Sequence, residues 1–310
     1  MRIVKLTQET EKNILENMLK RSPGQYGEYE SRVQEILARV KEQKDEAVFH
    51  YTKQFDRADM GPENVRVTDR EIEEAYRQVD PELLQVMKKA LENIRSYHAL
   101  QKQNSWFEST EKGTMLGQKL TPLKTVGVYV PGGKAAYPSS VLMNIVPAKV
   151  AGVDRIIMCT PCNVRGQVNP IVLAAAKEAG ADETYKVGGA QAIGAMAYGT
   201  ESIPKVDKIV GPGNNYVALA KKAVYGHVST DTVAGPSEIL VLADETANPR
   251  YVAADLLSQA EHDELASAIL ITTSQELARQ VSDQVEEFVK VLERREIIQK
   301  SLDQFGYILV

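Results

Sequence analysis

From Val126 onward, short apolar segments alternate with longer segments of helical pattern, and this alternation limits the possible folds more than any other feature. We predict seven strands, at Val126–Val130, Arg155–Cys159, Thr184–Val187, Lys208–Val210, Glu238–Leu242, Ala268–Thr272 and Tyr307–Val310. Helices are expected between them, at Ser139–Ala151, Pro170–Ala179, Ala190–Tyr198, Asn215–Tyr225, Pro249–Glu261 and Gln275–Leu292. This pattern is typical of doubly wound parallel sheets, in which ligands bind beyond the carboxyl ends of the strands. The sequence therefore predicts an α/β fold with mostly parallel sheets.

The first hundred residues have a helical pattern instead. Residues 28–52 carry apolar side chains at helical spacing. Thr68 and Glu71 form a capping box that opens a second helical segment, which runs past Pro81 to about residue 98. Residues 106–124 are rich in Gly, Thr and Lys, which favours a hairpin or a linker, and we place a domain boundary there.

Composition excludes several classes of function. The 310 residues carry a net charge of -5, so nucleic acid and anionic membranes are not expected as partners. No uncharged apolar run approaches the roughly 18 residues that a membrane span needs, and the first residues lack the apolar core of a signal peptide. We therefore expect a cytoplasmic protein that acts on small molecules.

The two cysteines, Cys159 and Cys162, follow a predicted strand, as a thioredoxin-like redox pair would. The segment from Asn163 to Pro170 reads as a loop, so no helix begins directly after Cys162. No second cysteine pair is present to complete a zinc site. The sequence favours a packing role for both thiols.

Four glycine-containing loops next to predicted strands each include a polar or phenolic side chain, and these are Tyr129, Gln191, Asn214 and Ser237. Glycine allows a close approach of the backbone to a ligand and leaves amides free at helix N-termini. None of the loops matches a dinucleotide or P-loop fingerprint. Together they still indicate a ligand site at one edge of the sheet.

A second candidate site lies in the segment Asp255-Leu-Leu-Ser-Gln259-Ala-Glu-His262-Asp263. Gln259 and His262 are three residues apart on a predicted helix, which puts both on one face. An amide oxygen and an imidazole there are consistent with half of a metal site, although a single helical histidine beside acids is more often solvated.

Five motifs in order closely resemble the histidinol dehydrogenase family. They are Val-Gly-Val-Tyr129-Val-Pro-Gly-Gly, Val-Gly-Gly-Ala-Gln191, Lys-Ile-Val-Gly-Pro-Gly-Asn214, Ala-Gly-Pro-Ser237-Glu and Leu-Leu-Ser-Gln259-Ala-Glu-His262. The resemblance implies a zinc-dependent cytoplasmic homodimer that oxidises L-histidinol to L-histidine with NAD, through the aldehyde, in the last steps of histidine biosynthesis. It implies two Rossmann-like lobes after an N-terminal helical segment at 1–20. The first lobe is expected from 21–109 plus 237–310, and the second, which contacts NAD, from 110–236.

Residue roles follow from the same resemblance. Tyr129, Gln191 and Asn214 are implied to contact NAD, and Ser237 the substrate. Gln259 and His262 are implied to bind both Zn²⁺ and the substrate. A zinc ion with open positions would orient the imidazole and amine of histidinol.

The sequence departs from the family in one respect. It contains no Pro-Glu-His-Leu motif, which carries the family's catalytic Glu-His pair, and His50, His98 and His227 lie in none of the site motifs. We interpret the chain as a C-terminally truncated member, expected to be inactive alone and to expose an uncovered strand at Tyr307–Val310. The alternatives are a metal-dependent hydrolase, for which no general base is found, and a non-catalytic remnant that keeps the fold.

Overall fold

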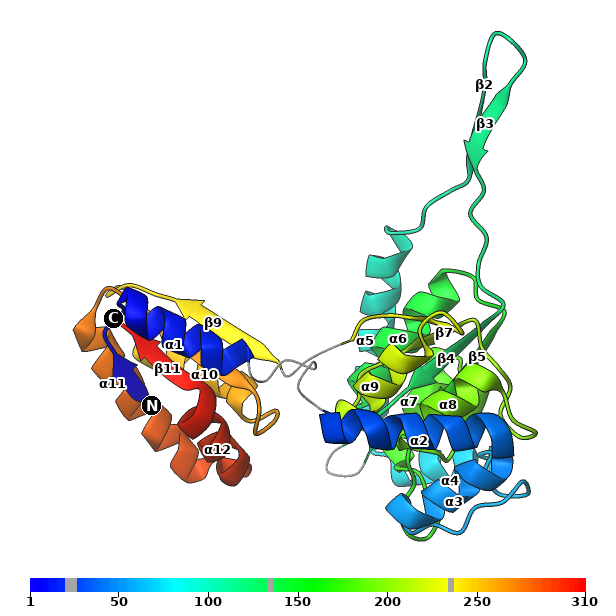
Figure 1. Ribbon diagram of the computed structural model, residues 1–310, viewed down its shortest axis with the longest axis horizontal. Coiled ribbons are helices and arrows are strands. Elements are labelled where there is room, and N and C mark those ends of the chain that lie inside the picture. Colours follow the sequence, from blue (N-terminus) through cyan, green and yellow to red (C-terminus); the bar gives the residue numbers. More distant parts are fainter. Residues whose placement is uncertain (20–26, 133–135, 234–236) are drawn as a thin grey trace. The chain divides into compact units, whose positions relative to one another are not determined.

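The computed structural model describes residues 1–19, 27–132, 136–233 and 237–310, which divide into two compact units. One unit is continuous, from Gly27 to Val233, and the other combines Met1–Tyr26 with Ala234–Val310 (Figure 1). Each unit has its own parallel sheet, so the predicted α/β fold class is confirmed. No helix within the described ranges is long and apolar enough to cross a membrane.

A five-stranded parallel sheet forms the centre of the continuous unit, in the order β6-β5-β4-β7-β8. The strands are β4 (Thr125–Tyr129), β5 (Arg155–Cys159), β6 (Glu183–Tyr185), β7 (Lys208–Val210) and β8 (Ser229–Thr230). Val128 of β4 is paired with Met158 on one side and Val210 on the other. The chain adds strands first on one side of β4 and then on the other, so the order reverses at β4.

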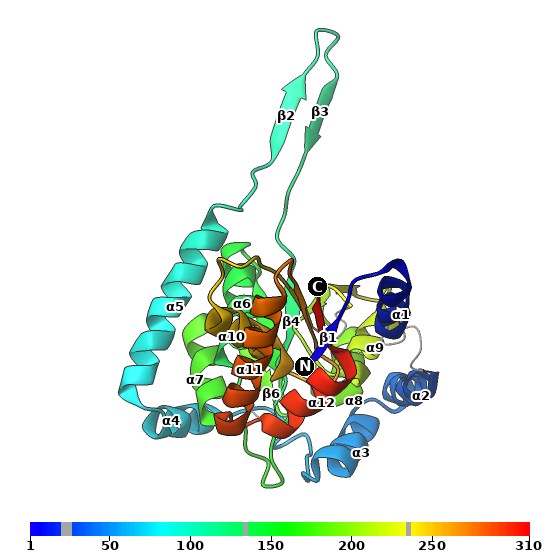
Figure 2. The same cartoon turned by 90° about the vertical axis from the view of Figure 1, so that its left-hand side faces the viewer.

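Helices cover both faces of this sheet in two groups (Figure 2). On one face, α6 (Pro138–Val150) and α7 (Pro170–Ala179) are covered in turn by α4 (Asp69–Gln78) and α5 (Pro81–Ala99). On the other, α8 (Gly189–Tyr198) and α9 (Asn215–Val224) are covered by α2 (Gly27–Gln43) and α3 (Asp45–Asp56). Both faces of the sheet are therefore buried, which explains its near-continuous apolar strands.

Local sequence signals set several of these helix ends. The predicted capping box is present at α4, where the Thr68 hydroxyl accepts from the Glu71 N–H at 3.3 Å and the Glu71 carboxylate accepts from the Thr68 N–H at 2.8 Å. Asn169 caps α7 before Pro170, and Gly180 ends it in the left-handed conformation. These signals are local, so the sequence located them.

The segment predicted as a hairpin or linker contains an antiparallel hairpin, formed by β2 (Trp106–Ser109) and β3 (Met115–Gln118). Figure 1 shows it projecting from the continuous unit as a long arm. Every residue of both strands is exposed, so the hairpin contributes nothing to the core.

The discontinuous unit contains a four-stranded parallel sheet in the order β1-β11-β10-β9. Its strands are β1 (Arg2–Val4), β9 (Glu238–Leu242), β10 (Ser267–Ile271) and β11 (Gly306–Leu309). Its helices are α1 (Gln8–Leu19), α10 (Pro249–Ala260), α11 (Gln275–Val291) and α12 (Arg295–Phe305).

The expectation of an uncovered strand at Tyr307–Val310 is wrong. Strand β11 lies between β1 and β10, so both of its edges are paired. Ile308 packs in the core with Ile298 and Leu302 of α12. On α1, Ile14 packs with Tyr307 and Leu309. The error arose because β1 has only three residues, too few to show a strand pattern.

The division into units differs from the expected one, which grouped residues 21–109 with 237–310. In the structure the helices after Gly27 belong to the same unit as β4 to β8. Met87 and Leu91 of α5 share a buried core with Val141 and Ile145 of α6. The expected N-terminal segment 1–20 instead supplies β1 and α1 to the other unit.

Candidate functional site

A cavity of about 440 Å³ opens at the carboxyl ends of the strands in the continuous unit. It lies where the strand order reverses, which is the usual ligand position in such sheets. Loops after β4, β5, β6 and β7 all contribute to its lining, as do helices α2 and α3. The three residues implied to contact NAD all line this cavity, and they are Tyr129, Gln191 and Asn214.

Tyr129 is the last residue of β4 and is buried. Its hydroxyl accepts a hydrogen bond of 3.1 Å from the N–H of Gly189, the first residue of α8. Burial raises the pKa of Tyr129 to about 12, so the phenol stays neutral in the physiological range. Tyr129 therefore fixes the end of β4 against the start of α8 and can donate its proton to a ligand.

Gln191 lies in the first turn of α8 and is almost fully buried. Its Oε1 is inaccessible to solvent and accepts no hydrogen bond from any described residue. A buried amide oxygen without a donor is unfavourable. Because Gln191 lines the cavity, a donor on a bound molecule can satisfy this oxygen.

Asn214 is the N-cap of α9, where its Oδ1 accepts from the N–H of Val217 at 3.2 Å. The cap occupies the carbonyl oxygen of the side chain, while the amide NH₂ keeps its two donors for a ligand. Asn214 therefore offers a donor to the cavity where Gln191 offers an acceptor.

A buried network holds the loop that precedes Asn214. The Lys221 ammonium donates to the carbonyl oxygen of Gly211 at 2.9 Å and pairs with Asp231, which accepts from the Gly211 N–H at 2.8 Å. Gly211 has φ +115, and an added Cβ would lie 2.0 Å from the Tyr129 carbonyl oxygen. Only glycine fits at this close approach of two backbones.

Sequence reasoning missed the contribution of the N-terminal helices to this cavity. Phe55 and Asp56, at the end of α3, line it together with Ile36 of α2 and Tyr216 of α9. Burial raises the pKa of Asp56 to about 6, and no described residue donates a hydrogen bond to its buried Oδ2. No motif marks Asp56 in the sequence, because packing of α3 on α8 brings it to the site.

The candidate metal residues lie in the other unit, at the end of α10. Gln259 is in the last turn and half-buried, whereas His262 is exposed and follows the helix in a turn. The His262 N–H donates to the Gln259 carbonyl oxygen at 3.1 Å, so the two residues are one turn apart. Within the described part of the chain, no group of three or more His, Cys, Asp or Glu residues could hold a metal ion.

Ser237 also belongs to the discontinuous unit. It lies directly before β9 and is exposed, and its carbonyl oxygen accepts from the Ser267 N–H at 3.1 Å. The rest of its predicted motif, Ala234 to Pro236, and the glycine-loop residue Gly133 lie outside the described residues.

The two cysteines are free and buried. Burial raises the pKa of Cys159 to about 12 and that of Cys162 to about 11. Thiols that stay protonated at neutral pH are poor nucleophiles, which argues against a redox pair.

The fold and the cavity define a class of protein, a doubly wound α/β protein with a ligand cavity at the switch point of its parallel sheet. The family model of histidinol dehydrogenase matches residues 19–310, and the chain belongs to that family. Relatives named histidinol dehydrogenase from Halalkalibacterium halodurans and Aquifex aeolicus are 57% and 56% identical over 91% and 96% of this chain.

The chain spans about two thirds of the length of these relatives, 66% and 68% respectively. A crystal structure of histidinol dehydrogenase from Elizabethkingia anophelis matches it with a TM-score of 0.89 and 39% identity, over 100% of this chain and 71% of that one.

Proposed function

We propose that the protein is an NAD-dependent oxidoreductase that converts L-histidinol to L-histidine through histidinal, in the last steps of histidine biosynthesis. Family membership and identities above half support the reaction over both a hydrolase and a non-catalytic remnant. One structural observation carries the cofactor assignment, the shared cavity of Tyr129, Gln191 and Asn214 at the switch point of the sheet.

The residues of this cavity suit a dinucleotide. The N-termini of α8 and α9 both reach it and favour negative charge, so they can hold the pyrophosphate. The Gln191 oxygen accepts from the ligand, and the Asn214 amide donates to it. NAD would supply a hydride acceptor, with one molecule used for the alcohol and a second for the hydrated aldehyde.

We propose further that Gln259 and His262 contribute to a zinc site at which histidinol binds, with Ser237 contacting the substrate. The family resemblance supports this, and an imidazole next to an amide oxygen is a suitable donor pair. Two ligands are fewer than a catalytic zinc site uses, so Gln259 and His262 alone would not form a complete site.

A binding titration of the 310-residue chain with NAD tests the cofactor assignment. Gln191→Ala should weaken NAD binding by about 1–2 kcal/mol, roughly tenfold, because it removes a buried acceptor. Asn214→Asp keeps the cap oxygen but removes both amide donors, so it should weaken binding with little change in helix stability. Gln78→Ala, in a second cavity, is the control and should leave affinity unchanged. Unchanged affinity in both cavity variants would reject the assignment.

The proposal also includes a cytoplasmic homodimer, for which family resemblance is the support. Sedimentation velocity at several concentrations tests the dimer. A single species with the mass of one chain at all concentrations would contradict it.

A further inference from the structure

Asp56 is the feature of the NAD cavity that the proposed function leaves unexplained. It is the last residue of α3, and the left-handed backbone of Arg57 ends the helix directly after it. Its Oδ2 is buried and receives no hydrogen bond from any described residue. Gln191 Oε1, in the lining of the same cavity, is in the same condition. Two buried acceptors without donors among the described residues therefore belong to the lining of one cavity.

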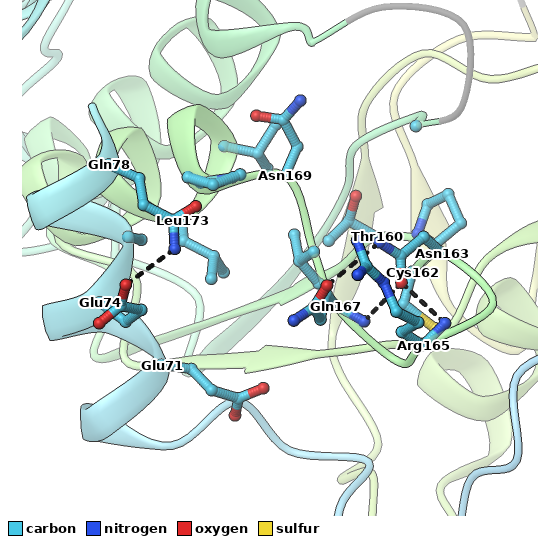
Figure 3. Close-up of a pocket in the computed structure, with 16 residues that line it drawn as sticks. Glu71, Glu74, Gln78, Thr160, Cys162, Asn163, Arg165, Gln167, Asn169 and Leu173 are labelled. Atoms are coloured by element: carbon cyan, nitrogen blue, oxygen red, sulfur yellow. Dashed lines mark hydrogen bonds between the residues drawn. The ribbon is translucent and has the colours of Figure 1, made fainter. Parts of the chain in front are cut away.

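A second cavity of the same unit does not show this condition. It also measures about 440 Å³ and lies between α4 and the loop that leads into α7 (Figure 3). Its polar side chains have partners within the protein, because Gln78 donates to Glu74 at 3.0 Å and Asn163 Oδ1 accepts from the backbone N–H groups of Arg165 and Gln167. Its other carboxylate, Glu71, pairs with Lys186. No lining atom of the second cavity is among the described buried atoms that lack a partner.

The missing partners define what a ligand must supply to the first cavity. A carboxylate and an amide oxygen both accept, so the ligand must donate. Asp56 is the one formally charged residue in the described lining of this cavity. Sugar hydroxyls are neutral donors that a carboxylate binds well, and an acidic side chain commonly holds the ribose hydroxyls of NAD. A phosphate on that ribose would instead bring about two negative charges to the carboxylate.

The aromatic residues near Asp56 agree with a nucleoside at this position. Phe55 is 51% exposed although it is a large apolar residue, and its ring stacks on Tyr51 at 5.7 Å between centroids. Tyr216 also lines the cavity. A planar base can pack on such rings while its ribose reaches the neighbouring carboxylate.

We propose that Asp56 is a specificity-determining residue that accepts a hydrogen bond from a ribose hydroxyl of NAD and rejects the phosphorylated dinucleotide NADP. This inference rests on the proposed NAD site. It adds a residue from the N-terminal helices to a site otherwise built on the loops of the sheet.

Calorimetric titration of the 310-residue chain with NAD and with NADP, at pH 8 where Asp56 is ionised, tests the inference. The unchanged chain should bind NAD at least about tenfold more tightly than NADP. Asp56→Asn should bind NAD about tenfold more weakly and NADP no more weakly, so the NAD-to-NADP affinity ratio should fall at least about tenfold. Asp56→Ala should change the ratio in the same direction, and circular dichroism confirms that both variants are folded.

Asp59→Asn is the matched control, because Asp59 is exposed, pairs with Lys53 and does not line the cavity. It should leave both affinities unchanged. An unaltered affinity ratio in Asp56→Asn, with NAD binding intact, overturns the inference and leaves the NAD site standing. A wild-type chain that binds neither dinucleotide overturns the NAD site and the inference together.

Discussion

The two parallel sheets of this protein differ in how their faces are covered. In the continuous unit, β4 is buried from Val126 to Tyr129 under helices on both faces. In the discontinuous unit, the edge strand β9 alternates between half-buried and exposed residues, with Leu240 at 59% and Leu242 at 76% exposure. The first sheet also carries a formed cavity at its carboxyl edge, whereas the described residues of the second unit include no group of three His, Cys, Asp or Glu side chains that could hold a metal ion. Dinucleotide binding and turnover should therefore be separable.

The sharpest test of that separation is turnover. The proposed reaction is that of the family, whereas residues 1–310 tested alone are expected to bind NAD but to produce no NADH above background from histidinol. General acid–base groups commonly contribute about 10²–10⁴-fold each, and the Pro-Glu-His-Leu motif that the family resemblance implies as their source does not occur in these 310 residues. Nicotinamide absorbance measures the rate. Robust NADH formation by a chain of confirmed mass would show that other residues supply the acid and base.

Destabilising the discontinuous unit should leave dinucleotide binding intact. Leu256→Ala removes a fully buried side chain that packs with Leu270 and Ile308, at a cost of about 2–5 kcal/mol in unfolding free energy. NAD affinity should not change, because every residue of the cavity belongs to the other unit. Urea unfolding and NAD titration measure the two effects. Leu242→Ala is the control at an exposed position and should lower the unfolding free energy by less than about 0.5 kcal/mol. If Leu256→Ala lost both stability and NAD binding, the two units would be energetically coupled.

Within the continuous unit, the network under the Gly211 loop should link stability to binding. Lys221→Met leaves Asp231 and the Gly211 carbonyl without their buried partner, which should cost about 2–4 kcal/mol. NAD should also bind more weakly, because Asn214 follows this loop. Lys222→Met is the control, since Lys222 is exposed and its ion pair with Glu30 contributes about 0–1 kcal/mol. Equal losses of stability and NAD affinity in the two variants would show that the buried network does not support the NAD site.

The smallest expected effect is a gain of stability at Asp56. The pKa of Asp56 is about 6 in the fold and 3.8 ordinarily, so the folded state holds its proton to higher pH than the unfolded state. The stability linked to this proton is present below pH 4 and is lost as pH rises through 6. Asp56→Asn should therefore raise the unfolding free energy by about 1–2 kcal/mol at pH 8 and leave it unchanged at pH 4. The value at pH 8 is smaller than the full pKa shift would give, because Asp56 is partly exposed to solvent. Urea unfolding at both pH values measures this, and an equal gain at both would exclude burial of the charge as its cause.

Local patterns predicted most of the two sheets. The strands β4 to β7, β9 and β10 lie within about two residues of their predicted bounds, because apolar segments between glycine loops are readable over short windows. The two-residue strand β8 was not predicted. Helix α12 lies outside the predicted helices, and the three residues of β1 carry no pattern of their own. What the sequence could not show was pairing between distant segments, such as β1 with β11.

The residues of the site also divide into those that local patterns predicted and those that depend on packing between distant segments. Tyr129, Gln191 and Asn214 lie at or shortly after the carboxyl ends of parallel strands, so their meeting in one cavity follows from the alternation itself. Asp56 comes from a helix that precedes the alternation and reaches the cavity through packing between helices. His262, expected on the helix with Gln259, lies just beyond its end, where helix boundaries are hardest to predict.

The discontinuous unit has a consequence for the order of events during synthesis. Residues 2–4 pair in register with residues 307–309, so β1 emerges from the ribosome long before its partner strand exists. Residues 27–233 form a unit whose sheet is complete before β9 is made. The large continuous unit can therefore fold while translation continues, whereas the first strand must wait, unpaired, until β11 is released.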